Sequence, residues 1–515
     1  MFSRVPSKFN TKKQLSFALS LVSVYLILLA FKGFLFASND LVDVMSYSKY
    51  LNNTALYPHD FYVQNIASTL PNERIIFAGL LALMGKSISW MTLLLHVISS
   101  LFLFTGIYRI AALFIQSPLL RWISILLLFI PLYGIGPGDC ELHYNMFIAS
   151  LLAKSIGIWA LYRLFKADLN WAYILLIPTT FIHPTVGAQL FLLFLGVHIY
   201  TMVIHKRKKG LIGIVLFLLC AGVWLILLQL HAFEKEVAST ALLFEIFEFR
   251  LAHHFFPEYF GLKNVGIGIL FALASLYYFI YRKKEIPGVF IALSITGMAI
   301  YSLSMSYLPL ELILSSQWFK SYIWVEMLAV IALISWIEKP LLRLNIRKWF
   351  DQIAIPTLWL TAIILAVMMH IPGNYFSNKS HDLFYQKEMS AEAEIALSAK
   401  DKTPNDATFI VPMHFTEFKY FSERSLYIDY KSVVHRKDAL PLWYTRIQDV
   451  YQIDISDRQE GLELYNQGKI NYSTLDLDEI EALKAKGIDY IVTYSTVSYP
   501  LDIISSNEEY IIYKL

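Results

Sequence analysis

Eleven apolar runs, separated by short polar or basic segments, organise the first 371 residues of the chain. Most of them approach the length of about 20 residues that a helix needs to cross a bilayer core. The runs are Leu15–Phe36, Met91–Tyr108, Trp122–Ile135, Met146–Tyr162, Trp171–Ile182, Thr185–Ile204, Leu211–Leu230, Val265–Tyr281, Gly288–Leu303, Trp318–Ile337 and Ile353–Ile371. The pattern predicts an α-helical polytopic membrane protein with about eleven transmembrane helices over residues 1–371.

Two places depart from this simple pattern. The stretch Ile75–Ser89 is apolar but short, and two glycines and a lysine interrupt it. We predict that it is a re-entrant or interfacial helix within a long first outer loop, residues 37–90. At His183-Pro184 a proline falls inside a run that would otherwise be continuous. Proline lacks a backbone donor and clashes with the preceding turn, so we expect two short spans or a kinked hairpin there.

Basic residues in short loops mark the cytoplasmic side of a membrane protein. The clear clusters are the N-terminus, His205–Lys209, Arg282–Lys284 and Arg343–Lys348. Eleven crossings place all of these clusters on one side and the C-terminal residues on the other. The sequence therefore predicts a multi-pass protein of a bacterial inner membrane with a cytoplasmic N-terminus.

The composition agrees with a membrane protein: 57% of the residues are hydrophobic and 16% are charged. No basic stripe interleaved with aromatic residues occurs, so we expect no nucleic-acid partner. Cys140 and Cys220 are the two cysteines. A disulfide framework or a cysteine-based zinc site is therefore disfavoured.

Beyond residue 371 the chain is more charged and has no apolar run long enough to span a membrane. Two helical segments and four short β-rich segments alternate there: Ala391–Ala399, Ala407–Pro412, Ser425–Tyr430, Leu477–Lys486, Ile488–Thr493 and Tyr510–Tyr513. This alternation is typical of a small α/β unit. We predict an extracytoplasmic α/β domain over residues 372–515.

The most informative polar feature is the pair Asp40 and Asp43, which follows the first apolar run. In a helix, residues three apart share one face. Two close carboxylates raise the pKa of one of them, which suits a general base. The alternative is a pair of solvated residues at a helix end, and the spacing alone does not decide between the two.

Further candidates lie in the other predicted outer loops. Asp139, Glu141 and His143 alternate, so an extended segment would point them the same way. They suit either a divalent cation such as Mg²⁺ or Mn²⁺, bound by Asp139 and Glu141, or a polar cap of the loop. His183 is a candidate for contact with the substrate, although a histidine at a helix break commonly binds freed backbone groups.

Arg250, His253 and His254 form a third group of candidates in the predicted fourth outer loop. Arginine binds phosphate through two parallel hydrogen bonds, so this group suits an anionic headgroup. The competing interpretation is an amphipathic helix over Thr240–Phe256 that lies on the membrane surface. The two interpretations are compatible.

An acidic pair directly after the first span, a long first outer loop and an outer C-terminal domain resemble the GT-C superfamily of membrane glycosyltransferases. The segments His183–Gly187, Phe409–Pro412 and Phe421–Lys431 are similar to a large bacterial group of GT-C-like proteins without assigned substrates. No W-W-D signature is found, which disfavours transfer to protein asparagine.

The resemblance implies a glycosyltransferase that takes its sugar from a polyprenyl-phosphate-linked donor in the membrane. It also implies that Asp40 or Asp43 is the catalytic carboxylate, with Asp40 the better match, and that Asp139 or Glu141 completes the site. Two other functions remain open: a transporter or flippase for a lipid-linked or anionic substrate, and a non-catalytic scaffold in polysaccharide assembly. The sequence does not identify the sugar, the acceptor or the oligomeric state.

Overall fold

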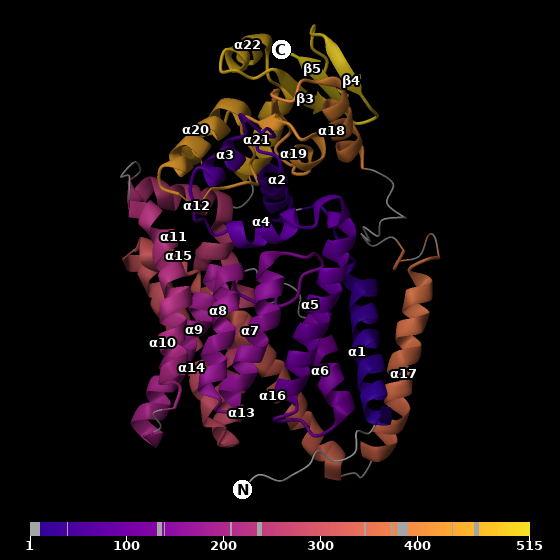
Figure 1. Cartoon of the computed structure of the whole chain (residues 1–515), viewed down its shortest axis with the longest axis vertical. Helices are drawn as coiled ribbons and strands as arrows, with labels where there is room; N and C mark the ends of the chain where they lie inside the picture. Colours follow the sequence, from indigo (N-terminus) through magenta and orange to yellow (C-terminus); the bar gives the residue numbers. More distant parts are fainter. Residues whose placement is uncertain are drawn as a thin grey trace.

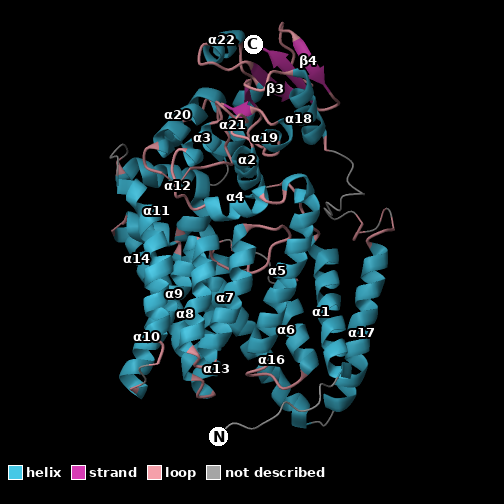
Figure 2. Cartoon of the chain, viewed as in Figure 1, coloured by secondary structure: helices cyan, strands magenta, loops and turns pink. Residues whose placement is uncertain are grey.

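The computed structural model describes residues 11–38, 40–130, 136–138, 140–206, 209–233, 239–308, 310–343, 347–371, 373, 375–377, 390–434, 436–457 and 463–515. Long helices stand side by side in the larger part of the molecule, and a smaller cap covers one end of them (Figure 1). The C-terminus lies in this cap. All strands of the described chain lie in the cap as well, and its other regular elements are helices joined by loops (Figure 2).

The long helices form the bundle. They are α1 (Thr11–Lys32), α5 (Ile88–Ala111), α6 (Pro118–Phe129), α7 (Ala149–Phe165), α8 (Leu169–Ile182), α9 (Pro184–His205), α10 (Leu211–Phe217), α11 (Val223–Phe233), α13 (Leu262–Tyr281), α14 (Glu285–Tyr307), α16 (Tyr322–Arg343) and α17 (Arg347–Met368). A π-helical turn, Leu218–Gly222, joins α10 to α11. Each predicted apolar run overlaps one of these helices.

Seven helical stretches of the described chain are long and apolar enough to cross a membrane. They are Thr11–Lys32, Gly85–Ala111, Pro184–His205, Leu211–Leu230, Leu262–Tyr281, Glu285–Tyr307 and Glu311–Leu341. Shorter apolar helices stand among them. The protein is therefore a multi-pass membrane protein, while the number of eleven crossings stays a prediction.

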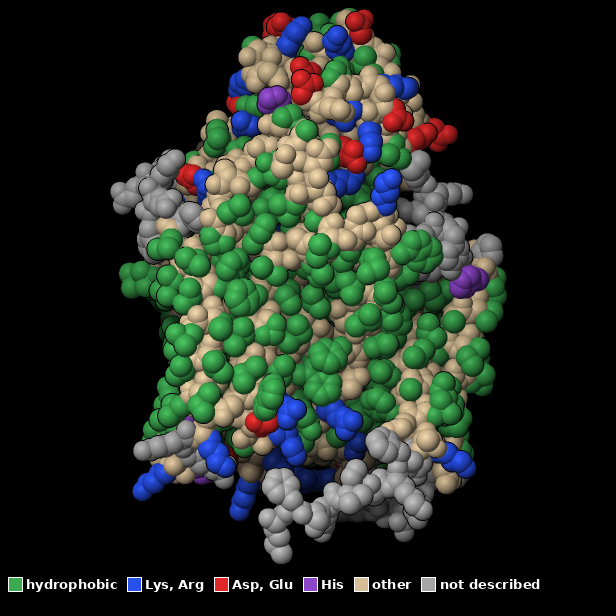
Figure 3. All heavy atoms as spheres, viewed as in Figure 1, with side chains coloured by type: hydrophobic (Ala, Val, Ile, Leu, Met, Phe, Trp, Pro, Cys, Tyr) green, Lys and Arg blue, Asp and Glu red, His purple; other side chains and the backbone are tan. Residues whose placement is uncertain are grey.

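The surface divides into three zones along the long axis. Hydrophobic side chains form a broad belt around the helices, lysines and arginines gather at the lower end, and charges of both signs cover the cap (Figure 3). An apolar belt of this kind is what a bilayer requires. The basic lower end is the one that the sequence predicts to be cytoplasmic.

The split at His183 is confirmed. Helix α8 ends at Ile182, and α9 begins at Pro184, where a missing N–H costs nothing because the first turn of a helix has no partner for it. The two helices approach closely behind the break. A Cβ on Gly187 would lie 2.5 Å from Cα of Thr180, so only glycine fits there.

The predicted first outer loop, residues 37–90, contains three helices, α2 (Asp40–Asn52), α3 (Phe61–Ala67) and α4 (Ile75–Ala82), followed by a 3₁₀ turn. Helix α4 lies across the top of the bundle in Figure 1. Its 8 residues span about 12 Å at 1.5 Å per residue, too little to cross a bilayer. The predicted short helix outside the set of long spans is therefore present.

Shorter helices lie around the cap and at the upper end of the bundle. They are α12 (Thr240–Phe255), α15 (Glu311–Ser316), α18 (Ala391–Lys402), α19 (Phe418–Ser422), α20 (Ala439–Tyr451), α21 (Glu463–Ser473) and α22 (Leu477–Lys484). The helix predicted over Thr240–Phe256 is thus α12, which is kinked at Leu251. Both helices predicted in the C-terminal region are present as α18 and α22.

The sheet of the cap has five strands in the order β2-β1-β3-β5-β4. They are β1 (Thr408–Ile410), β2 (Ser425–Leu426), β3 (Tyr490–Tyr494), β4 (Ile503–Ser506) and β5 (Tyr510–Lys514). Strands β2, β1 and β3 are parallel, whereas β5 pairs antiparallel with β3, and β4 pairs antiparallel with β5. The sequence predicts four of the five strands and misses the edge strand β4.

The first outer loop and the C-terminal region pack against each other. The Tyr57 hydroxyl donates to the carbonyl of Lys419, and Lys49 donates to the carbonyl of Tyr420 and to the Glu423 carboxylate. The buried Asp60 carboxylate accepts from the backbone N–H of Leu426 at the edge of the sheet. The cap is therefore built from two segments that are far apart in the sequence.

Candidate active site

Asp40 and Asp43 occupy the first turn of α2, so the two residues are helical, the condition under which residues three apart share one face. Carboxylates are stable there because the N-terminal end of a helix carries a partial positive charge. The two side chains reach adjacent residues of the C-terminal region. Asp40 Oδ1 lies 2.7 Å from Lys431 Nζ, and Asp43 Oδ1 lies 2.5 Å from Ser432 Oγ. Two adjacent residues of the cap therefore contact the predicted acidic pair.

Asp40 is the accessible member of the pair, with 61% of its side chain exposed. Partial burial acts to raise its pKa, but the Lys431 ammonium outweighs that effect, and Arg74 and His254 lower the pKa further. The net pKa lies below the ordinary value, so Asp40 is ionised at neutral pH. A substrate that approaches α2 can reach this carboxylate.

Asp43 belongs to a more enclosed network. Burial raises its pKa to about 6 against the attraction of the Lys419 ammonium, and repulsion from Asp429 adds to the rise. Lys419 is fully buried and lies 3.5 Å from Asp429 and 3.7 Å from Asp60. One lysine thus faces three carboxyl groups inside the cap.

The Ser432 hydroxyl contacts two carboxyl groups of this network, those of Asp43 and Asp429. Its Oγ lies 2.5 Å from both Asp43 Oδ1 and Asp429 Oδ2, and it accepts from Lys419 Nζ at 3.1 Å. A hydroxyl has a single proton and donates to one carboxylate only. The other short contact requires a proton on Asp43 or Asp429. The raised pKa of Asp43 is consistent with that proton.

Arg250, predicted as an anion-binding residue, holds the segment that carries Lys431. Its guanidinium donates to the carbonyl of Tyr430 at 2.8 Å and to that of Lys431 at 3.1 Å. It also lies 4.7 Å from the centre of the Tyr430 ring. These contacts place Arg250 beside the site as a positioning residue for Lys431.

Several cationic groups lie on the bundle side of Asp40. Lys320, in a 3₁₀ turn before α16, is close enough to influence His183, His254 and Lys154 electrostatically. Arg74 influences Asp40 and His183; its Nε has no hydrogen-bond partner among the described residues and lies 3.7 Å from Glu73 Oε1. Among the described residues, no carboxylate lies within ion-pair distance of Lys320. This concentration of positive charge suits an anionic ligand.

The predicted histidines are ordered by backbone contacts. His183 Nδ1 accepts from the N–H of Val186 and so caps α9, which leaves its proton on Nε2. His254 Nδ1 donates to the carbonyl of Gly138 at 3.1 Å, which leaves Nε2 without a proton. The pKa of His254 lies well below its ordinary value because of burial and the nearby Lys320. The His253 ring lies 4.1 Å from that of His254.

The predicted metal site has no complete set of ligands in the described chain. Glu141 forms an ion pair with Lys32, and His143 is buried, with Nε2 bonded to Ser100. The two side chains therefore contact different helices. Asp139 lies outside the described residues. No group of three or more His, Cys, Asp or Glu side chains that could hold a metal ion occurs within those that are described.

Sequence reasoning missed the residues that the cap contributes. Lys431, Ser432, Asp429 and Lys419 carry no motif of their own, although Lys431 lies at the end of the segment that resembles the GT-C-like group. Lys320 was likewise not predicted. A solitary lysine beside a span is usually a membrane-interface residue, so its position gave no signal.

Comparisons with known proteins give one short family match and several structural likenesses. Residues 390–450 match the family model described as "Domain of unknown function (DUF6798)". This segment contains Lys419 and Lys431. No curated protein sequence matches the chain.

Solved structures resemble the chain over nearly its whole length. ArnT from Cupriavidus metallidurans bound to undecaprenyl phosphate is 12% identical, with 98% of each chain covered and a TM-score of 0.41. Its apo state is 12% identical, with 99% of this chain and 98% of that chain covered and a TM-score of 0.37. The oligosaccharyltransferase from Archaeoglobus fulgidus, tethered with an acceptor peptide, is 10% identical, with 94% of this chain and 69% of that chain covered and a TM-score of 0.38. At these scores we transfer neither a site nor an activity.

Proposed function

We propose that the protein is a glycosyltransferase that moves a sugar from a polyprenyl-phosphate-linked donor to an acceptor hydroxyl at the outer face of the membrane. The observation that carries the proposal is the position of Asp40. It is an accessible, ionised carboxylate in the first turn of α2, close to the Lys431 ammonium and to the cationic group around Arg74 and Lys320. The carboxylate suits an acceptor hydroxyl, and the cationic groups suit the phosphate that is attached to the anomeric carbon of the donor sugar.

The anionic part of the donor binds to the cationic group. Arginine and lysine form charge-assisted hydrogen bonds with phosphate oxygens, and Nε2–H of His183 is a further donor. Exposed apolar side chains of the bundle provide a surface for the polyprenyl chain (Figure 3). The phosphate therefore stays at the level of the cap while its tail remains in the membrane.

In the proposed reaction, Asp40 accepts the proton of the acceptor hydroxyl while the hydroxyl oxygen attacks the anomeric carbon. The bond between that carbon and the phosphate oxygen breaks, and the phosphate leaves with the electron pair. Arg74 and Lys320 stabilise the charge on the departing phosphate. Direct displacement inverts the anomeric configuration.

Lys431 has a second role in this scheme. Its ammonium keeps the pKa of Asp40 low and holds the carboxylate in place. The acceptor must displace or share this contact, so the cap controls access to the base. Asp43 stays bonded to Ser432 and supports α2 from behind.

The proposal is tested with the purified protein in sealed vesicles that contain radiolabelled polyprenyl-phosphate sugars. We expect a covalent glycosylated product with the wild-type protein and none with Asp40→Asn at equal expression. Movement of labelled lipid across the membrane without a product would instead establish the transporter. Absence of both, with normal folding, would favour the scaffold.

A further inference from the structure

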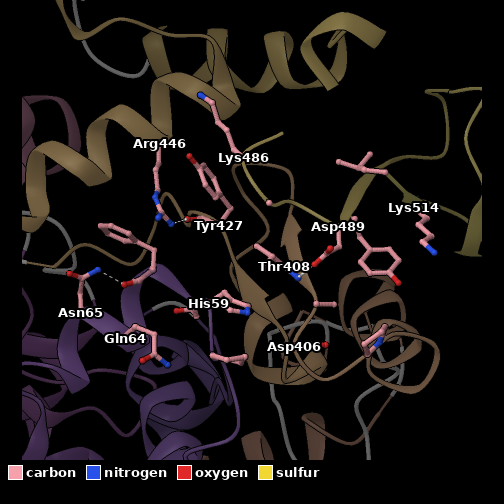
Figure 4. A pocket seen from close by; sticks show the side chains of 18 of the residues that line it. His59, Gln64, Asn65, Asp406, Thr408, Tyr427, Arg446, Lys486, Asp489 and Lys514 are labelled. Carbon is pink, nitrogen blue, oxygen red and sulfur yellow. Dashed lines mark hydrogen bonds between the residues drawn. The ribbon is translucent and has the colours of Figure 1, made fainter. Parts of the chain in front are cut away.

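A large cavity lies in the cap, at the seam between the first outer loop and the C-terminal region. Its volume is about 820 Å³, within the roughly 300–1,000 Å³ range of small-molecule sites. Figure 4 shows His59, Gln64 and Asn65 from the first loop on one side and Tyr427, Arg446 and Thr408 on the other. Asp40 and the cationic group do not line this cavity, so it is a separate site.

The polar groups of the cavity include both donors and acceptors. The amide N–H of Gln64 donates to the carbonyl of Tyr57, and that of Asn65 donates to the carbonyl of Phe61. The side-chain oxygens of Gln64 and Asn65 remain as acceptors. Arg446 uses Nη1 for the carbonyl of Tyr427 and has further N–H groups to donate. A ligand with many hydroxyls fits this mixture because each hydroxyl both donates and accepts.

Charge in the cavity is close to balanced. Three lining cations, Arg446, Lys486 and Lys514, face the three lining carboxyl groups of Asp60, Asp406 and Asp489, and Lys486 is also paired with Asp449 outside the lining. Balanced charge disfavours a strongly anionic ligand such as a nucleotide, which needs an excess of cations. The lining contrasts in this respect with the cationic group beside Asp40.

Aromatic rings complete the wall. The Arg446 guanidinium lies 4.3 Å from the centre of the Tyr427 ring and 5.0 Å from that of Phe61. Tyr490, the first residue of β3, also lines the cavity. A wall in which aromatic rings stand next to polar groups suits pyranose rings, which combine C–H faces with hydroxyls.

We propose that this cavity binds a neutral oligosaccharide, the part of the acceptor glycan that lies behind its reacting hydroxyl. This inference rests on the proposed transferase function and specifies its acceptor. The cavity wall is linked to the acidic pair: Asp60 lines the cavity and lies 3.7 Å from Lys419, which contacts Ser432 beside Asp43. A bound glycan therefore touches the framework that holds α2.

The test uses the full-length protein in detergent micelles and an array of neutral oligosaccharides from bacterial envelopes. We expect saturable binding of at least one glycan. Asp406→Ala combined with Lys514→Ala changes two exposed lining residues, and loss of two charged hydrogen bonds should weaken binding at least about tenfold. Asp401→Ala with Lys484→Ala, both exposed and outside the cavity, is the matched control and should leave binding unchanged.

The binding assay contains no donor lipid, so its outcome is independent of transfer. Failure to bind any glycan, or equal binding by the cavity double variant and the control, would overturn the inference while leaving the transferase proposal standing. Glycan binding that is lost in the cavity variant, in a protein that transfers no sugar, would support the cavity and count against the transferase. Binding of acidic peptides or nucleotides in place of glycans would also overturn it.

Discussion

Asp40 and Asp43 stand one helical turn apart, yet they lie in regions of opposite character. Asp40 is exposed, paired with Lys431 and kept ionised. Asp43 is partly buried, bonded to Ser432 and close to Asp429 and the buried Lys419. The Asp40 carboxylate can exchange its contact with Lys431 for a contact with a substrate, whereas Asp43 fixes α2 to the cap. We therefore propose a catalytic role for Asp40 and a structural role for Asp43, although the two residues look equivalent in the sequence.

The difference between Asp40 and Asp43 is tested most directly by replacing each carboxylate in turn with a neutral amide. Asp40→Asn should lower the rate of sugar transfer by about 10²–10⁴-fold, the usual contribution of a general base. Asp43→Asn should retain most of the rate, since the amide oxygen can still accept the hydrogen bond that Ser432 Oγ donates to Asp43. Steady-state transfer assays at equal protein concentration measure both. Equal losses in the two variants would show that the division of roles is wrong.

Removing the buried cation tests the structural region. Lys419→Met leaves three carboxyl groups without their common partner, and breaking a buried pair in this way costs about 3–5 kcal/mol of unfolding free energy. Thermal unfolding in detergent measures the loss. Lys484→Met, an exposed lysine on α22, is the control and should unfold as the wild type does. A Lys419→Met protein as stable as that control would contradict the network.

The cationic group is tested by changing Arg74 or Lys320 to Gln. Each change removes a charge-assisted hydrogen bond to phosphate and should weaken binding of a polyprenyl phosphate roughly tenfold to hundredfold. Lys263→Gln changes an exposed lysine at the start of α13 and should have no effect. Native mass spectrometry with titrated lipid measures the affinities. Unchanged binding in both variants would remove the phosphate site from this position.

The smallest expected effect is a pH dependence of stability. Asp43 has a pKa near 6 in the folded protein and an ordinary value of 3.8. The folded state therefore binds more protons in this window, and the unfolding free energy falls as pH rises from about 4 to 6, on the order of 1–2 kcal/mol.

Asp43→Asn should flatten this slope without removing it. Asp60, whose pKa is also raised by burial, keeps part of the dependence, and Lys419 stays charged throughout. Unfolding curves at several pH values compare the variant with the wild type. An identical slope in both proteins would place the shared proton on another group.

Much of the architecture follows from the pattern of apolar residues. The helices, the break at His183 and four strands of the cap are local features, and local sequence encodes them. The partners of the acidic pair are not local: Asp43 and Ser432 are 389 residues apart. No periodicity connects such positions. Arg250 illustrates the same limit, because its charge is visible in the sequence but its use for two backbone carbonyls is not.

The placement of the donor phosphate beside Asp40 is tested most directly by a cryo-EM structure of the protein in nanodiscs with a polyprenyl phosphate. We predict density for the phosphate between Arg74 and Lys320, within reach of Asp40, with the prenyl chain descending along the bundle. Phosphate density at the basic lower end, or bound lipid whose headgroup contacts neither Arg74 nor Lys320, would contradict the proposed site.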